Sequence, residues 1–152
     1  MAENRNKLAT VFADFFAHMK ELVGQTGEES DLKIQKVVEG EAPIGMHPIP
    51  FVTIQFLKMR TKHRADRDIV WDCQMRIRIS TRATSADGAT VELLTKAALV
   101  TNKIQAYDKP DGVEGFEATE WALTFPIDPT TPATAQADST QSFTVAVALG
   151  EN

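Results

Sequence analysis

The stretch VWDCQMRIRIS, residues 70–80, alternates apolar and polar side chains over its whole length. Side chains along a β-strand point to opposite faces with a period of two residues, so this pattern predicts a strand with one buried face. The expected strand runs from Ile69 to about Thr84. Its apolar face consists of Trp71, Cys73, Met75, Ile77 and Ile79. We expect this face to lie in the core beneath the helices of the chain.

The polar face of the same strand carries a row of arginines, Arg76, Arg78 and Arg82. The chain of 152 residues is acidic as a whole, with a formal net charge of −5. Residues 58–82 nevertheless hold 8 basic and 3 acidic side chains, whereas residues 83–152 hold 3 basic and 10 acidic ones. This separation of charge favours contact between copies of the chain or with a charged partner. An exposed surface that only keeps the protein in solution is the alternative.

Apolar residues that recur every three or four positions predict two helices. The first is expected from about Glu3 to Val23, where Gly24 can end it. Its apolar stripe consists of Leu8, Val11, Phe12, Phe15, Phe16, Met19, Leu22 and Val23. The second is expected after the turn SADG, residues 85–88, and ends near Tyr107. Its two apolar rows consist of Val91, Leu94 and Ala98, and of Leu93, Ala97, Val100, Ile104 and Tyr107.

Two further strands are predicted before the arginine strand. A short one lies within LKIQKVVEGE, residues 32–41, with Leu32, Ile34 and Val37 facing inward. The segment FVTIQFLKMR, residues 51–60, is the second. Residues 60–68 contain no large apolar side chain, so we expect them to form the charged, protruding tip of a long hairpin.

The last third of the chain predicts a loop, a strand, a second loop and a closing strand. The first loop covers residues 108–115. The strand runs from Glu117 to Ile127 and buries Trp121, Leu123, Phe125 and Ile127. Residues 129–141, PTTPATAQADSTQ, have few large hydrophobic side chains, which predicts an exposed loop or arm. The segment SFTVAVAL, residues 142–149, alternates again and predicts the closing strand.

Together these elements predict one domain, residues 1–152, of the α+β class. Its sheet should be mostly antiparallel with a long β-hairpin arm, and two helices should pack on one face. The opposite face of the sheet would then carry the three arginines.

Several classes of function are disfavoured by the residues. Cys73 is the single cysteine, so no intrachain disulfide can form, and its place on the apolar face predicts a buried side chain. The three histidines are scattered, and we expect neither a metal nor another cofactor. No phosphate-binding loop or nucleophile motif occurs, so an enzyme is not expected. Aromatic residues do not interleave with the basic ones, which disfavours specific nucleic-acid binding. No continuous apolar run predicts a signal peptide or membrane span, so we expect a protein that acts in the cytoplasm.

The order of these elements resembles the tail terminator proteins of long-tailed bacteriophages. The shared layout is an amphipathic N-terminal helix, a Pro-Phe entry into a strand (IPFVTIQF, residues 49–56), a hairpin arm, the WDCQMRIRIS strand, a helix and an alternating final strand. The resemblance covers about residues 8–149. It implies an α+β fold and a homo-oligomeric ring of six copies that binds the tail tube protein and stops tube growth. It also implies a contact with the head–tail connector protein, at the neck end of the virion tail. DNA would pass through the lumen without sequence-specific binding.

The resemblance gives the arginine row a place at a boundary between subunits or in the lumen. The candidate interface residues are Lys58, Arg60, Lys62, Arg64, Arg67, Arg76, Arg78, Arg82, Glu117 and Glu120. Carboxylates of a neighbouring subunit would face the row, with Glu114, Glu117, Glu120 and Asp128 as candidates. Two alternatives remain open. One is a head-side stopper or head–tail joining protein, and the other is a small α+β enzyme or ligand-binding module.

Overall fold

The structure, a computed structural model, describes residues 7–23, 34, 36–40, 50–65, 68–83, 86–116, 120–124 and 133–148. Within these residues, two helices and six strands follow one another. In order they are α1 (Lys7–Lys20), β1 (Lys36–Glu39), β2 (Phe51–Ala65), β3 (Asp68–Ala83), α2 (Ala86–Gln105), β4 (Val113–Gly115), β5 (Ala122–Thr124) and β6 (Ala133–Ala148). Neither described helix is both long and apolar enough to cross a lipid bilayer.

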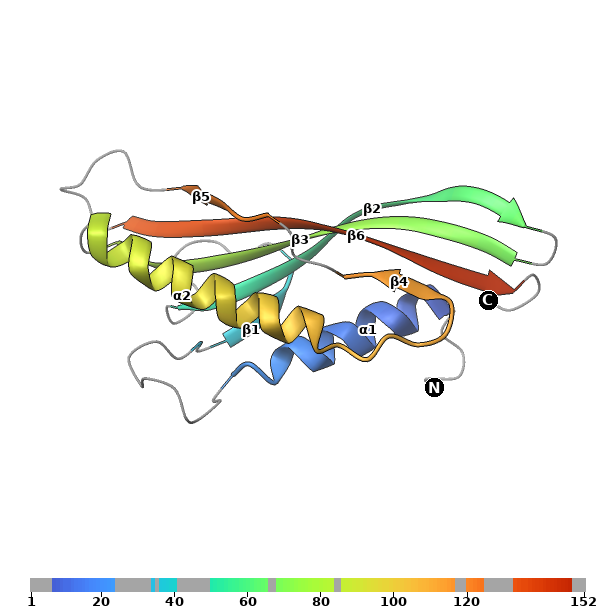
Figure 1. The fold of residues 1–152 in the computed structure, drawn as a ribbon, viewed down its shortest axis with the longest axis horizontal. Helices are drawn as coiled ribbons and strands as arrows, with labels where there is room; N and C mark the ends of the chain where they lie inside the picture. Colours follow the sequence, from blue (N-terminus) through green and yellow to red (C-terminus); the bar gives the residue numbers. More distant parts are fainter. Residues whose placement is uncertain are drawn as a thin grey trace.

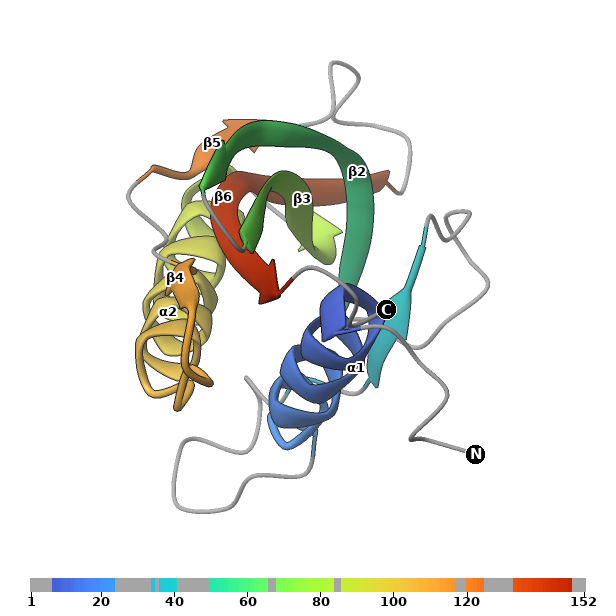
Figure 2. The ribbon, with the colours of Figure 1, turned by 90° about the vertical axis from the view of Figure 1, so that its right-hand side faces the viewer.

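The six strands form one sheet in the order β1-β2-β3-β6-β4. β5 also pairs with β6, along a different part of that strand from β4. Only the pair β1–β2 is parallel, and the other pairs are antiparallel. Both helices lie on the same side of the curved sheet (Figures 1 and 2). The predicted α+β class, the mostly antiparallel sheet and the single helical layer are therefore confirmed.

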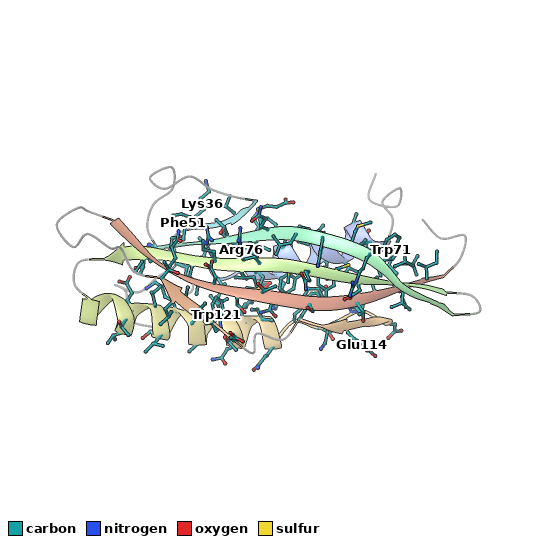
Figure 3. All side chains as sticks on the ribbon, turned by 90° about the horizontal axis from the view of Figure 1, so that it is seen from above. Lys36, Phe51, Trp71, Arg76, Glu114 and Trp121 are labelled. Carbon is teal, nitrogen blue, oxygen red and sulfur yellow. The ribbon has the colours of Figure 1, made fainter. Side chains whose placement is uncertain are left out.

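The alternation in β3 places its apolar residues as predicted. Cys73, Met75, Ile77 and Ile79 are completely buried in the core between the sheet and the helices. Trp71 is only partly buried, because it lies toward the end of the strands that extends past both helices (Figures 1 and 3). The alternation of apolar and polar side chains in residues 70–80 thus determines which face of the sheet the helices cover.

The predicted hairpin is present, but its tip differs from the expectation. β2 continues to Ala65 and β3 begins at Asp68, so most of residues 60–68 belong to strands. β6 also pairs with β3 along its whole length, from Asp68–Ala148 to Ala83–Ala133. We call residues 58–65, 68–74 and 142–148 the arm, in which β6 adds a third strand to the β2–β3 hairpin (Figure 1). The strands thus reach further into the charged tip than expected, because polar side chains are compatible with a strand that has one solvated face.

The prediction of a loop at residues 129–141 was also wrong. Residues 133–141 form the first half of β6, a strand of 16 residues. Alternation continues there with small side chains, because Ala135, Ala137, Ser139 and Gln141 are all buried on one face. Small residues on this face let α2 pack close to the sheet. In the second half of the strand, Phe143, Val145 and Val147 are buried as expected.

The segments between α2 and β6 differ from the prediction as well. Part of the expected loop 108–115 is strand β4, and the expected strand 117–127 is described only as β5, residues 122–124. Gly115 makes the β4–β6 pairing possible, since its φ is +105° and a Cβ would lie 2.7 Å from the Phe143 Cα. Trp121 and Leu123 are partly buried. The predictions for Leu32, Phe125 and Ile127 lie outside the described residues.

One of the two apolar rows on α2 is buried, and the other is exposed. Leu93, Ala97, Val100 and Ile104 face the core, followed by Tyr107 after the helix. Val91 and Leu94 keep 64% and 55% of their surface exposed, and Ala98 is exposed as well. Lys96 is completely buried, and its Nζ donates to the Glu92 carboxylate at 3.1 Å. On α1, the buried residues Leu8, Val11, Phe15 and Met19 follow the predicted stripe.

Candidate subunit interface

Arg76 and Arg78 lie on the sheet face opposite the helices, as predicted, because they alternate along β3 with the core residues Met75, Ile77 and Ile79. Arg76 Nη2 donates to the Gln55 side-chain oxygen at 2.6 Å. Arg78 binds Asp138 with two hydrogen bonds, from Nε at 2.6 Å and from Nη2 at 3.4 Å. The two side chains of this ion pair are each about one quarter exposed. Paired geometry of this kind is the strongest contact that arginine makes with a carboxylate.

These contacts change the explanation for the row. We expected carboxylates of a neighbouring subunit to face it, but β6 of the same chain supplies Asp138 to Arg78. Asp138 is the direct cross-strand partner of Arg78, and Gln55 is that of Arg76. Asp138 could not be recognised from the sequence because residues 129–141 were expected to form a loop, and the pairing of Gln55 with Arg76 depends on a register that the pattern of two strands does not give. Arg82 pairs with Thr134 through the backbone, and its side chain lies outside the description.

The basic residues of the arm lie on β2. Lys58 is exposed, and the Arg60 side chain is 71% exposed although its Nη2 lies 3.3 Å from the Asp72 carboxylate. An exposed pair of this kind contributes at most about 1 kcal/mol, so Arg60 can exchange partners readily. The backbones of Lys62 and Arg64 belong to β2, while their side chains and all of Arg67 are outside the described part.

The acidic candidates that the structure describes lie toward the sheet edge opposite β2. Glu114 is exposed in the middle of β4, at the edge opposite β2 (Figure 3). Glu120 is exposed shortly before β5. Glu117 and Asp128 fall outside the described residues. The structure therefore separates Arg60 and Lys58 from Glu114 by the width of the sheet, and within one chain these charges do not meet.

Among the described residues, exposed large apolar side chains occur singly at Val23, which the predicted stripe of the first helix wrongly included, and in pairs at two distant places. Leu57 and Met59, beside and within the arm, keep 41% and 49% of their surface exposed. Val91 and Leu94 lie in the first half of α2, which begins at the end of the molecule opposite the arm (Figure 1). Exposed apolar side chains that gather in pairs favour contact with another protein.

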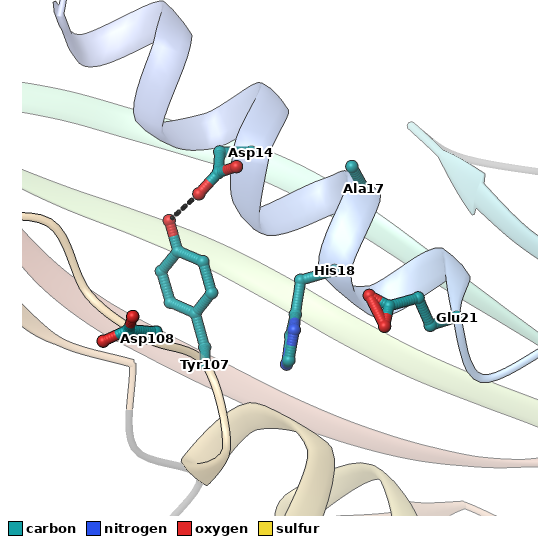
Figure 4. Close-up of a pocket in the computed structure, with 6 residues that line it drawn as sticks. All are labelled: Asp14, Ala17, His18, Glu21, Tyr107 and Asp108. Carbon is teal, nitrogen blue, oxygen red and sulfur yellow. Dashed lines mark hydrogen bonds between the residues drawn. The ribbon is translucent and has the colours of Figure 1, made fainter.

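A polar pocket of about 360 Å³ lies where α1 passes the end of α2 (Figure 4). Its lining residues are Asp14, Ala17, His18, Glu21, Tyr107 and Asp108. The Tyr107 hydroxyl donates to the Asp14 carboxylate at 2.9 Å, and His18 Nε2 lies 2.7 Å from the Lys103 carbonyl oxygen. Lys103 also donates to Glu21 at 3.3 Å. Most polar groups of the pocket are thus used to hold α1 against the end of α2.

Tyr107 and Asp14 in this pocket are engaged with each other. Burial, followed by the hydrogen bond to Asp14 and the negative charges of Asp14 and Asp108, raises the pKa of Tyr107 far above its usual value. The hydroxyl therefore stays protonated and acts as a donor at neutral pH. Asp14 accepts that hydrogen bond and is already engaged. The pocket is better explained as a contact between helices than as an active site.

Cys73 is completely buried, as the sequence predicted. Burial, with a smaller effect of the Asp72 carboxylate, raises the pKa of its thiol to about 11. A thiol with this pKa is almost entirely protonated at neutral pH and is a poor nucleophile. Cys73 is therefore a core residue.

Within the described residues, no three His, Cys, Asp or Glu side chains come together in a way that could hold a metal ion. Comparison of the sequence with protein-family models and with curated proteins gives no match.

Proposed function

We propose that this chain is a structural virion protein of the tail terminator type. In this proposal, a ring of about six copies caps the tail tube, stops its polymerisation and offers its other face to the head–tail connector. Genomic DNA passes through the opening of the ring without base-specific contacts. The layout on which the resemblance rests supports the proposal, because helix, long paired strands, helix and long final strand follow one another in the structure.

The observation that carries the proposal is the presence of two separate exposed surfaces on an elongated molecule. One comprises Leu57, Met59, Lys58 and Arg60, and the other comprises Val91 and Leu94 on α2. A subunit that closes a ring on a tube needs one surface for its neighbour and another for the tube. A small enzyme needs instead a concave site with groups free to react. The pocket at Tyr107 holds groups that already bond one another.

The mass of the chain in solution tests the ring. One chain has a mass of 16.7 kDa, so light scattering should give about six times this value for the purified protein at low ionic strength. The mass should decrease as salt rises, because exposed charges are screened over about 8–10 Å. A mass of one chain at every concentration and ionic strength would contradict the ring and favour the enzyme or ligand-binding alternative. A head-side stopper or joining protein would also form a ring, and the neighbouring genes separate it from a terminator.

A further inference from the structure

We infer that the sheet continues from one copy to the next, with the open edge of β2 in the arm paired to the open edge of β4 in the neighbour. This inference rests on the proposed ring and names the contact that closes it. The partner is a second copy of this chain, and both edges belong to residues that the structure describes.

At the level of the arm, the two outer strands of the sheet are β2 and β4. β1 covers only residues 51–54 of β2, and along residues 55–65 no described strand pairs with the side of β2 that faces away from β3. On the other side, β4 pairs with β6 and with no further described strand. Its outer edge is open only in part, because the Val113 amide donates to the Pro110 carbonyl at 3.1 Å and the Gly115 carbonyl accepts from Lys109 Nζ at 3.1 Å. An open edge offers backbone donors and acceptors to an incoming strand.

The two open edges lie at the same level of the sheet. Arg60 pairs with Asp72, Asp72 with Thr144, and Thr144 with Glu114. Cross-strand partners share one face of a sheet, so Arg60 and Glu114 occupy the two ends of a single row. When a second sheet is added edge to edge at this level, Glu114 of one copy comes beside Arg60 of the next.

The charges of the two edges are opposite. Residues 58–65 contain four basic and no acidic side chains, and residues 107–120 contain five acidic ones and a single lysine. Pairing of β2 with β2 of another copy would instead bring basic residues together, and like charges on opposite strands are destabilising. Two irregularities in the β2–β3 register, between Phe56 and Lys58 and between Thr61 and His63, bend the same edge. Charge and bending both restrict which strand can pair there.

Apolar surface is available beside the same edge. Leu57 and Met59 are two of the five large hydrophobic side chains that the described residues expose. Met59 lies on the core face of the sheet, since it pairs with Cys73, but 49% of its surface is exposed. A neighbour at this edge would cover both side chains, which adds apolar burial to the backbone pairing.

The geometry allows a ring. β2 and β4 form opposite edges of the sheet at the arm, so a contact between β2 of one copy and β4 of the next joins two different surfaces. The resulting pair of copies still has one free β2 edge and one free β4 edge. A head-to-tail contact of this kind closes into a ring if the rotation between copies divides a full turn, and otherwise forms a filament.

Disulfide cross-linking tests this contact. The variants Arg60→Cys and Glu114→Cys are purified separately, and Cys73 can stay because it is buried and largely protonated. When the two variants are mixed and oxidised, we expect cross-linked dimers, since Cα atoms on paired strands are close enough for a disulfide. A chain with both substitutions should give a ladder that ends at the size of the ring. Lys36→Cys, which is exposed on β1, replaces Arg60→Cys in the control mixture and should give no dimers.

Charge reversal provides the second arm of the test. Arg60→Glu should reduce the light-scattering mass to that of one chain, and Glu114→Arg in the same chain should restore the ring. Lys36→Glu is the matched control and should leave the ring intact. If the wild type forms a ring but the mixed Arg60→Cys and Glu114→Cys variants give no cross-linked dimers, the edge contact is wrong and the proposed ring is unaffected. If the wild type is a single chain under all conditions, both the edge contact and the proposed function are wrong.

Discussion

Replacing Phe15 with alanine should reduce the free energy of unfolding by about 3–5 kcal/mol. Phe15 is completely buried on α1, and its ring stacks on Phe116 at a centroid distance of 4.4 Å and meets Tyr107 edge-on at 5.1 Å. Phe116 in turn stacks on Phe143 of β6 at 4.3 Å. Loss of the Phe15 ring therefore leaves a cavity where α1, the end of α2 and the sheet meet. Chemical denaturation of the two chains gives the difference.

The neighbouring Phe16 provides the control. It is only partly buried and packs at the margin of the core, with Lys20 Nζ 5.3 Å from its ring centroid. Phe16→Ala should therefore lower the free energy of unfolding by less than about 2 kcal/mol. Equal effects of the two substitutions would contradict the arrangement of α1 described above.

Replacing Arg78 with glutamate should destabilise the folded chain itself by about 2–3 kcal/mol. The substitution puts a second carboxylate beside Asp138, whose oxygen now accepts from Arg78 Nε at 2.6 Å. Both side chains are about three quarters buried, so water screens the repulsion only in part. Thermal or chemical unfolding of dilute protein measures the effect on the folded chain.

Exchanging Arg78 and the Asp138 carboxylate distinguishes the effect of the lost ion pair from the effect of the changed side-chain size. Arg78→Glu combined with Asp138→Arg should recover part of the lost stability, because opposite charges again face each other across β3 and β6. Arg78→Glu combined with Glu114→Arg is the matched control and should not recover it. If Glu114→Arg rescued the variant and Asp138→Arg did not, the carboxylate facing Arg78 would come from a neighbouring copy.

Hydrophobic alternation with large side chains was enough to predict the centre of the fold. Cys73, Met75, Ile77 and Ile79 leave one face for the helices, and a shift of one residue would bury Arg76 and Arg78. The same reasoning failed at Ala135, Ala137 and Ser139, because small and polar side chains gave no apolar signal. Their burial depends on α2, whose position is a tertiary property that local pattern does not contain.

The candidate interface residues differ in how many contacts they make within their own chain. The excess of positive charge identified Lys58 and Arg60, which the structure places on an exposed strand edge. It also selected Arg76 and Arg78, which bond Gln55 and Asp138 of their own chain. Composition reports charge but not register, and the register decides which charges have internal partners.

The length of tail tubes grown in the presence of this chain tests the central claim most directly. Electron microscopy would compare tubes of the tube-forming protein encoded in the same genome, polymerised with and without the chain. We expect short tubes of narrow length distribution with a ring at one end, and uncapped tubes of unlimited length with the Arg60→Glu variant. Tubes that keep growing without a ring at saturating amounts of the wild-type chain would contradict the account.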